Sequence, residues 1–260
     1  MADEYQPSKR SVQRDLSRVQ GNYFSPPFHN ATVEFDTWEP VYEVILDEFG
    51  FDRRADEHAA DVLAELTHPF DLDRLGEIEG AVVAIAGAGP SLSSPDSVDR
   101  AREADVVIAA STAADVLLDS GVEVHCMVTD LDKNPETVRT LTEAGVPVAV
   151  HAHGDNVEEL SAVVPACRKE FVLPTTQAEP VDHVRNFGGF TDGDRAAFLA
   201  HALGANSLTF VGWDLDDPAV DPIKATKLEW AERLLHWLES IRGERFDVLD
   251  GRRSTIERPI

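Results

Sequence analysis

The feature that most constrains the fold of this chain is a change of pattern at Gly80. After this residue, short apolar stretches alternate with segments of helical periodicity. We predict strands over residues 82–86, 106–110, 124–128, 148–151, 171–173, 208–211 and 246–249. Because these stretches are apolar on both faces and helices separate most of them, they indicate an α/β fold, with a mostly parallel sheet and helices on both of its faces.

Several helix boundaries are also recognisable. Asn134-Pro135-Glu136 is typical of a helix start, with Asn134 at the cap position. Another helix is expected to begin near Thr191 or Asp192 and to end at Leu203-Gly204. A long amphipathic helix is expected over about residues 223–241.

Two further helices, over residues 38–51 and 56–66, are predicted before Gly80 by their apolar spacing. Residues before them are polar and rich in proline, which is typical of a tail or mobile arm. The predicted division is therefore a tail over residues 1–31, an N-terminal helical cap over 32–79, an α/β catalytic domain over 80–250 and a C-terminal tail over 251–260.

The charge of the chain limits its partners. The formal net charge is −25, and the basic residues are 18 arginines and only 5 lysines. Nucleic acids and anionic membranes require a basic face, so we expect neither as a partner. An acidic, lysine-poor composition is typical of proteins from salt-loving archaea. No signal peptide or bilayer-spanning run is recognisable, which predicts a cytoplasmic location.

The polar residues of greatest interest are Asp130 and Asp132, which follow an apolar run. The run, residues 122–128, gives way to a polar turn at this point. If the run is a strand, the two side chains share one face, because strand side chains alternate. Two adjacent carboxylates repel unless a cation neutralises them, and Mg²⁺ is held by one or two carboxylates plus substrate phosphates. The pair is thus a candidate magnesium site, and an ordinary acidic turn is the alternative.

Other polar clusters follow the remaining predicted strands. In open α/β sheets, ligands bind beyond the carboxyl ends of the strands, so these clusters are expected at one edge. They are Gly87-Ala88-Gly89-Pro90-Ser91-Leu92, Ser111-Thr112, His151-Ala152-His153-Gly154-Asp155-Asn156, Thr175-Thr176-Gln177 and Gly212-Trp213-Asp214.

The glycine turn and the histidine cluster each allow two interpretations. Glycines let backbone amides approach an anion, but residues 87–92 lack the Gly-Lys-Ser/Thr end of a Walker loop and the third glycine of a dinucleotide fingerprint. The histidine cluster is one residue short of a binuclear zinc hydrolase pattern, because Asn156 stands at its last position. We therefore disfavour zinc and interpret Asp155 as a third carboxylate facing a metal or a phosphate.

A phosphate site in so acidic a chain needs local cations. The candidates are Arg195, at a predicted helix start, and the lysines Lys133, Lys224 and Lys227. Trp213 is a candidate for stacking on a flat ring, although packing in the core explains it equally well.

Five of these motifs occur in an order that resembles a known family. They are Gly-Ala-Gly-Pro-Ser-Leu (87–92), Thr-Asp-Leu-Asp (129–132), His-Ala-His-Gly-Asp-Asn (151–156), Gly-Phe-Thr-Asp-Gly-Asp-Arg (189–195) and Gly-Trp-Asp (212–214). Together they resemble the archaeal 6-hydroxymethyl-7,8-dihydropterin pyrophosphokinases, over about residues 35–241. That family is related in fold to thiamine pyrophosphokinases, whose metal site is also built from aspartates after strands.

The resemblance implies transfer of a diphosphate from ATP to the hydroxymethyl group of a reduced pterin, with release of AMP and a requirement for Mg²⁺. The product would enter folate or methanopterin biosynthesis. The expected residues are Asp130, Asp132 and Asp155 for the metal; Asp130, Asp132, Lys133 and Arg195 for catalysis; Gly87, Gly89, Pro90, Ser91, Thr112, Lys224 and Lys227 for ATP; and Asn156, Asn186, Asp192 and Trp213 for the pterin.

Two other functions are weighed against this one. An Asp-x-Asp pair after a strand also holds the metal of nucleotide-sugar glycosyltransferases, although this chain lacks the extra domains of related flagellin-modifying proteins. A non-catalytic nucleotide-binding protein is the second alternative. A homo-oligomer is compatible with the sequence, which does not determine the oligomeric state.

Overall fold

The computed structural model describes residues 33–260, so the predicted tail over residues 1–31 lies outside the described part. Six parallel strands form one sheet in the order β5-β4-β3-β2-β1-β6. They are β1 (Val82–Ala86), β2 (Val106–Ala110), β3 (Cys126–Thr129), β4 (Val148–Ala152), β5 (Val172–Thr176) and β6 (Ser207–Val211). Every residue of β2, β3, β4 and β5 is buried, as expected for a sheet covered on both faces.

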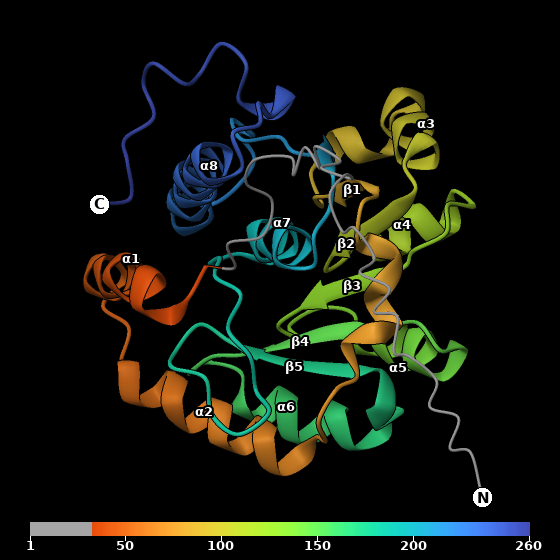
Figure 1. The fold of residues 1–260 in the computed structure, drawn as a ribbon, viewed down its shortest axis with the longest axis vertical. Coiled ribbons are helices and arrows are strands. Elements are labelled where there is room, and N and C mark those ends of the chain that lie inside the picture. The colour runs from red at the N-terminus through yellow and green to blue at the C-terminus, as the bar shows by residue number, and fades with distance from the viewer. Residues whose placement is uncertain (1–32) are drawn as a thin grey trace, which may run out of the picture.

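Helices cover both faces of the sheet, which confirms the predicted α/β fold (Figure 1). One core contains residues of α1 (Phe35–Phe49), α7 (Asp192–Ala202) and α8 (Pro222–Arg242) with alternate strand positions such as Ile85 and Ile108. The other core contains residues of α2 (Arg53–Leu66), α3 (Pro95–Glu103), α4 (Ala113–Asp119), α5 (Pro135–Ala144) and α6 (Val157–Val163), together with the intervening strand positions.

The predicted strand over residues 246–249 is wrong. Phe246 precedes a short 3-10 helix, Asp247–Leu249, and its backbone N–H donates to the Glu239 carboxylate of α8 instead of to a strand. Its ring is fully buried and lies 4.9 Å from the ring of Phe210, measured between centroids. The apolar stretch therefore belongs to the core, but it follows α8 as an irregular segment.

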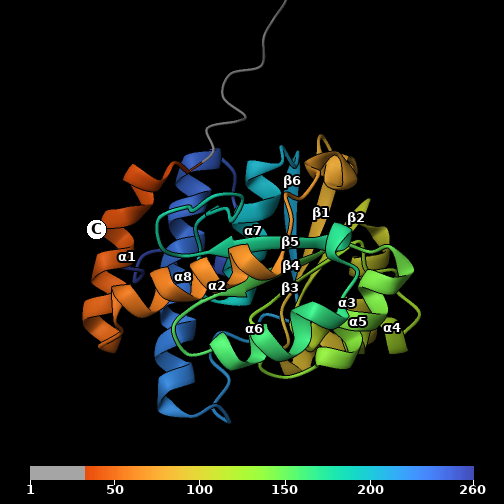
Figure 2. The same cartoon turned by 90° about the horizontal axis from the view of Figure 1, so that it is seen from below.

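The N-terminal helices are integrated into the fold. Trp38 of α1 is fully buried, packs edge-on to Phe198 of α7 and donates from Nε1 to the Gln177 carbonyl at 2.8 Å. Helix α2 contacts β4, β5 and α6, beside one edge of the sheet (Figure 2).

The last residues of the chain are held by an ion pair, in which Arg253 contacts the Glu239 carboxylate of α8. Among residues 33–260, no helix is long and apolar enough to cross a bilayer.

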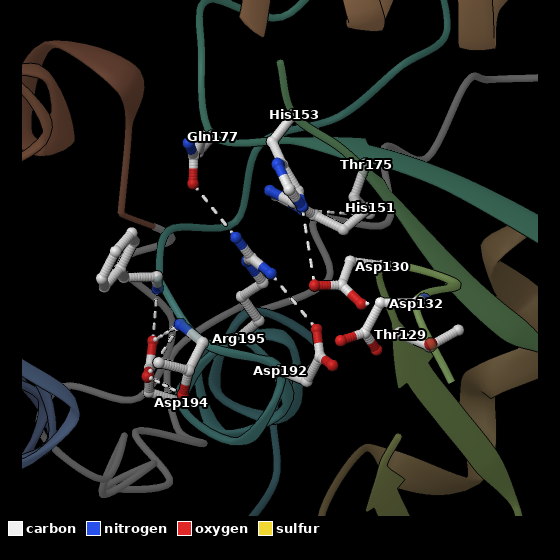
Figure 3. Close-up of polar contacts among 12 residues, drawn as sticks. Thr129, Asp130, Asp132, His151, His153, Thr175, Gln177, Asp192, Asp194 and Arg195 are labelled. Carbon is white, nitrogen blue, oxygen red and sulfur yellow. Dashed lines mark hydrogen bonds and ion pairs between the residues drawn. The ribbon is translucent and has the colours of Figure 1, made fainter. Parts of the chain in front are cut away.

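The strand order sets the position of the site. Strands β1 to β5 follow one another toward one edge, whereas β6 lies on the other side of β1. A crevice at such a reversal, beyond the carboxyl ends of the strands, is the usual ligand position in open α/β sheets. The loops after β1 and β6 meet there, and helix α7 begins close to the turn that follows β3 (Figure 3).

Candidate active site

The acidic pair lies on a tight turn just beyond β3. The strand ends at Thr129, and Leu131 adopts a left-handed conformation with φ of 70°. Two local bonds hold this turn, from the Leu131 N–H to Thr129 Oγ1 at 3.0 Å and from the Asp132 N–H to Asp130 Oδ1 at 3.3 Å. The prediction that the carboxylates share the face of a strand is therefore wrong, because a turn brings them together.

Asn156 fixes this turn from the neighbouring loop. Its Nδ2 donates to the carbonyls of Asp130 and His151, both at 2.7 Å, and its Oδ1 accepts from the His153 N–H at 3.0 Å. Asn186, the other predicted pterin amide, donates to the carbonyls of Gln177 and Ala178 and accepts from the Gly188 N–H. Both amides are bound to backbone, so they occupy supporting positions in place of the predicted pterin contacts.

Asp192 at the start of α7 brings a third carboxylate toward the pair (Figure 3). The helix begins with a capping box, in which Thr191 and Asp194 satisfy each other's backbone and side-chain groups. Burial, together with the nearby carboxylates of Asp130 and Asp132, raises the pKa of Asp192 to about 7. The three carboxylates thus form a strongly negative spot that favours a cation.

The electrostatics of the pair itself are asymmetric. Burial alone would raise the pKa of Asp130, but hydrogen bonds with His153 and Asp132 outweigh it and hold that pKa well below its usual range. Burial and the Asp130 carboxylate raise the pKa of Asp132. His153 Nε2 lies 3.5 Å from Asp130 Oδ2. Asp130 is therefore the member of the pair that stays ionised most readily.

Arg195 is the buried cation of the site. Its Nη1 donates to Asp192 Oδ1 at 3.2 Å and its Nη2 donates to Gln177 Oε1 at 3.0 Å (Figure 3). Gln177 in turn donates to the Asp56 carboxylate of α2 at 2.8 Å. The sequence placed Gln177 in a polar cluster after a predicted strand but gave it no role. It missed Asp56, which belongs to no motif with a recognisable chemistry.

A cavity of about 400 Å³, which we call the acidic cavity, opens onto these residues. Phe51 and Phe190 form part of its wall, beside Asp56 and Gln177. Eight residues predicted from the sequence line it, namely Asp130, Asp132, Lys133, Asp155, Asp192, Arg195, Lys224 and Lys227. Burial and the neighbouring Arg195 lower the pKa of Lys227.

A second cavity of about 210 Å³, the glycine-loop cavity, lies between the loops after β1 and β6. It is lined by the predicted residues Gly87, Gly89, Pro90, Thr112, Asp192, Trp213 and Lys224, and also by Ser111 and Leu228. The two cavities share Lys133, Thr191, Asp192 and Lys224, so they meet beside the acidic turn, at the residue that follows it and at the start of α7.

The glycine turn itself does not offer the amides that an anion cradle needs. The N–H groups of Gly87 and Gly89 donate to the carbonyls of Val211 and Gly212, both at 2.9 Å, and the Ser91 N–H donates to Asp214 Oδ2 at 2.8 Å. A Cβ on Gly89 would lie 2.3 Å from that same carboxylate oxygen. The glycines are thus required by close packing of the two loops, and the predicted amide contact with phosphate is not supported at these positions.

The donor set suits a hard cation held by few protein ligands. Among residues 33–260, no group of three or more His, Cys, Asp or Glu side chains forms a complete metal site. Two carboxylates on one turn nevertheless fit Mg²⁺, which keeps several waters and binds substrate phosphates. Asp155 lines the acidic cavity, whereas Asp192 is the carboxylate that interacts with both Asp130 and Asp132.

Two adjoining cavities that share two lysines and Asp192, with the acidic turn lining one of them, suit a ligand that carries phosphate, and together with the fold they define a phosphotransferase of the α/β class. Comparison with known proteins narrows this class. A family model described as 6-hydroxymethylpterin diphosphokinase MptE-like matches residues 58–219. The chain therefore belongs to the MptE-like 6-hydroxymethylpterin diphosphokinase family.

Archaeal relatives are similar over nearly their whole length. The chain is 39% identical over 235 residues to the 6-hydroxymethyl-7,8-dihydropterin pyrophosphokinase of Methanothermobacter thermautotrophicus, covering 82% of this chain and 100% of that protein. It is 38% identical over 229 residues to the protein of that name from Pyrococcus furiosus, covering 80% and 95% of the two chains. The resemblance drawn from five motifs is thus confirmed, and the family favours a diphosphotransferase over both alternative functions.

Proposed function

We propose that the protein transfers a diphosphate from ATP to the hydroxymethyl oxygen of 6-hydroxymethyl-7,8-dihydropterin and releases AMP. Support comes from the family and from one structural observation, the junction of two cavities beside the acidic turn. A transfer between two substrates requires two binding spaces that meet at the transferred group. Lys133, Thr191, Asp192 and Lys224 line both spaces.

We assign ATP to the glycine-loop cavity and the pterin to the acidic cavity. The former lies at the reversal of strand order, where nucleotides commonly bind, and Trp213 and Leu228 offer apolar contacts for a base. The acidic cavity has aromatic walls, Phe51 and Phe190, beside polar groups that can bind the edge of a flat heterocycle.

The pterin hydroxyl attacks the β-phosphorus of ATP in line, and the bond from that phosphorus to the oxygen of the α-phosphate breaks as AMP leaves. Lys133 and Lys224 hold the phosphates at the junction, and Arg195 supplies positive charge from the pterin side. We assign to Asp192 the acceptance of the hydroxyl proton. Positioning and electrostatics therefore provide most of the rate acceleration.

Asp130 and Asp132 are the residues that would hold Mg²⁺. When bound, the ion would neutralise charge on the ATP phosphates. Asn156 keeps the two carboxylates in place through its bond to the Asp130 carbonyl, and His153 contacts the Asp130 carboxylate from the same loop. Asp155 stays a proposed contributor, because its side chain lines the same cavity.

A direct assay tests this function. The protein is incubated in high salt with ATP, Mg²⁺ and 6-hydroxymethyl-7,8-dihydropterin, and we expect equal amounts of AMP and pterin diphosphate. ADP as the nucleotide product would contradict a diphosphate transfer. For the subsite assignment, Trp213→Ala should raise the KM for ATP and Phe190→Ala should raise the KM for the pterin, whereas the reverse pattern would exchange the two cavities.

A further inference from the structure

We propose that Asp56 and Gln177 are positioning residues that orient the Arg195 guanidinium, so that helix α2 takes part in the catalytic site. The proposal rests on the function proposed above, since it requires that Arg195 act on the substrates. Gln177 contacts Arg195 directly, and Asp56 contacts it through Gln177. Asp56 lies on α2, just before the segment that the family model matches.

The contacts form a continuous chain from α2 to the site. Gln177 Nε2 donates to Asp56 Oδ2 at 2.8 Å, and Arg195 Nη2 donates to Gln177 Oε1 at 3.0 Å. All three residues are nearly inaccessible, with 3% of Asp56, 3% of Gln177 and 7% of Arg195 exposed. Water therefore competes little for these bonds, and each donor depends on its protein partner.

The carboxylate determines which way the Gln177 amide faces. An amide has a donating and an accepting end, whereas a carboxylate only accepts. Asp56 therefore requires the Nε2 end of Gln177, which leaves Oε1 for Arg195. If residue 56 could also donate, the Gln177 amide could reverse and present N–H groups to the guanidinium, and the contact with Arg195 would be lost.

Asp56 is itself held from two other sides. Its Oδ2 also accepts from the Tyr42 hydroxyl at 2.7 Å, and its Oδ1 accepts from the Gly154 N–H at 2.7 Å. Gly154 belongs to the loop that also carries His153 and Asp155. These bonds fix the carboxylate, and they provide a control: removal of the Tyr42 hydroxyl weakens the same cluster without changing what Gln177 can accept or donate.

The experiment compares three variants by steady-state kinetics with ATP and the pterin, and by thermal melting. We expect Asp56→Asn to lower kcat by about 10- to 100-fold, because a hydrogen bond to a charged group is lost or reversed. The matched control Tyr42→Phe should lower the melting temperature and leave kcat within about threefold of the parent protein. An equal loss of kcat in both variants would overturn the proposal, because it would indicate a purely structural cluster.

The double variant D56N/Q177E provides the rescue. In this variant the side-chain amide at position 56 can donate to the carboxylate at position 177. That carboxylate can also accept from Arg195, so the bond to the guanidinium is restored. We expect kcat to recover to within about tenfold of the parent value. A double variant that folds but is no more active than Asp56→Asn would overturn the proposal.

A readout without turnover separates this proposal from the proposed function. In crystal structures of Asp56→Asn and of the parent protein, we expect the variant to lose the hydrogen bond between residue 177 and Arg195. An unchanged contact would overturn the orientation argument even if the protein is an active diphosphokinase. Absence of AMP and pterin diphosphate in the parent protein would instead refute the proposed function, while the crystal structures still test the orientation.

Discussion

The turn after β3 and the turn after β1 look alike in the sequence, yet they do different things in the structure. Both are short polar motifs at the carboxyl ends of buried strands. The turn after β3 was expected to bind Mg²⁺, and the turn after β1 was expected to bind the phosphates of ATP. The first directs the carboxylates of Asp130 and Asp132 into the acidic cavity. In the second, the N–H groups of Gly87, Gly89 and Ser91 donate to acceptors within the protein. A motif can therefore bind a ligand only if some of its polar groups still face a cavity, as the carboxylates of Asp130 and Asp132 do.

The largest effect should come from the acidic turn. Asp130→Asn removes the carboxylate that stays ionised most readily, and we expect a loss of kcat of about 10³-fold with the fold retained. Asp155→Asn tests the proposed third contributor on the same cavity, and a smaller loss, of less than about tenfold, is expected because residue 155 lies on the neighbouring loop and not on the turn. Steady-state rates and circular dichroism provide the measurements. Comparable losses in both variants would contradict a site centred on the pair and would make Asp155 an equal contributor.

Removal of a lysine that lines both cavities should give the next largest effect. Lys224 lines both cavities, so Lys224→Ala should lower kcat/KM by about 10- to 100-fold. Lys169→Ala provides a control, because this lysine lies in a short 3-10 helix before β5 and lines neither cavity. An equal effect of the two substitutions would show that net charge, not position, explains the result.

Magnesium binding should depend on pH through Asp192. Its pKa of about 7 means that the carboxyl is mostly neutral below that pH and charged above it. A more negative site attracts Mg²⁺ more strongly, so affinity should rise between about pH 5 and pH 8, by up to about tenfold per pH unit, and then level off. Calorimetric titration with Mg²⁺ alone measures this. Asp192→Asn should flatten the profile, and an unchanged slope would assign the proton to another group.

The smallest effect should come from the glycine turn and should appear in stability. A Cβ on Gly89 would lie 2.7 Å from the Gly212 carbonyl oxygen as well as against Asp214, so Gly89→Ala should cost about 1–3 kcal/mol of unfolding free energy. A Cβ on Gly76 meets nothing within 4 Å, which makes Gly76→Ala the control with little or no cost. Urea denaturation compares the two. A folded, fully stable Gly89→Ala protein that has lost ATP binding would restore the phosphate-cradle interpretation.

Most of the fold could be predicted because its signals are local. A buried parallel strand is a short apolar run between polar turns, and six such runs were identified close to their observed positions. Residues 246–249 have the same apolar character but follow α8, where Phe246 is buried against Phe210 without joining the sheet. Apolar content predicts burial, whereas strand pairing depends on what lies beside the segment.

The sequence by itself determined the α/β alternation, the acidic turn after β3, the cations near it and the family resemblance, because each depends on neighbouring residues or on motif order. Only the tertiary structure decided which of these groups remain available. In the folded protein the amides of Asn156 and Asn186 donate to backbone carbonyls. Asp56 and Gln177, which are 121 residues apart in the sequence, form a hydrogen bond. Hydrogen-bond partners of buried polar groups are chosen by contact in space, and local sequence does not contain that information.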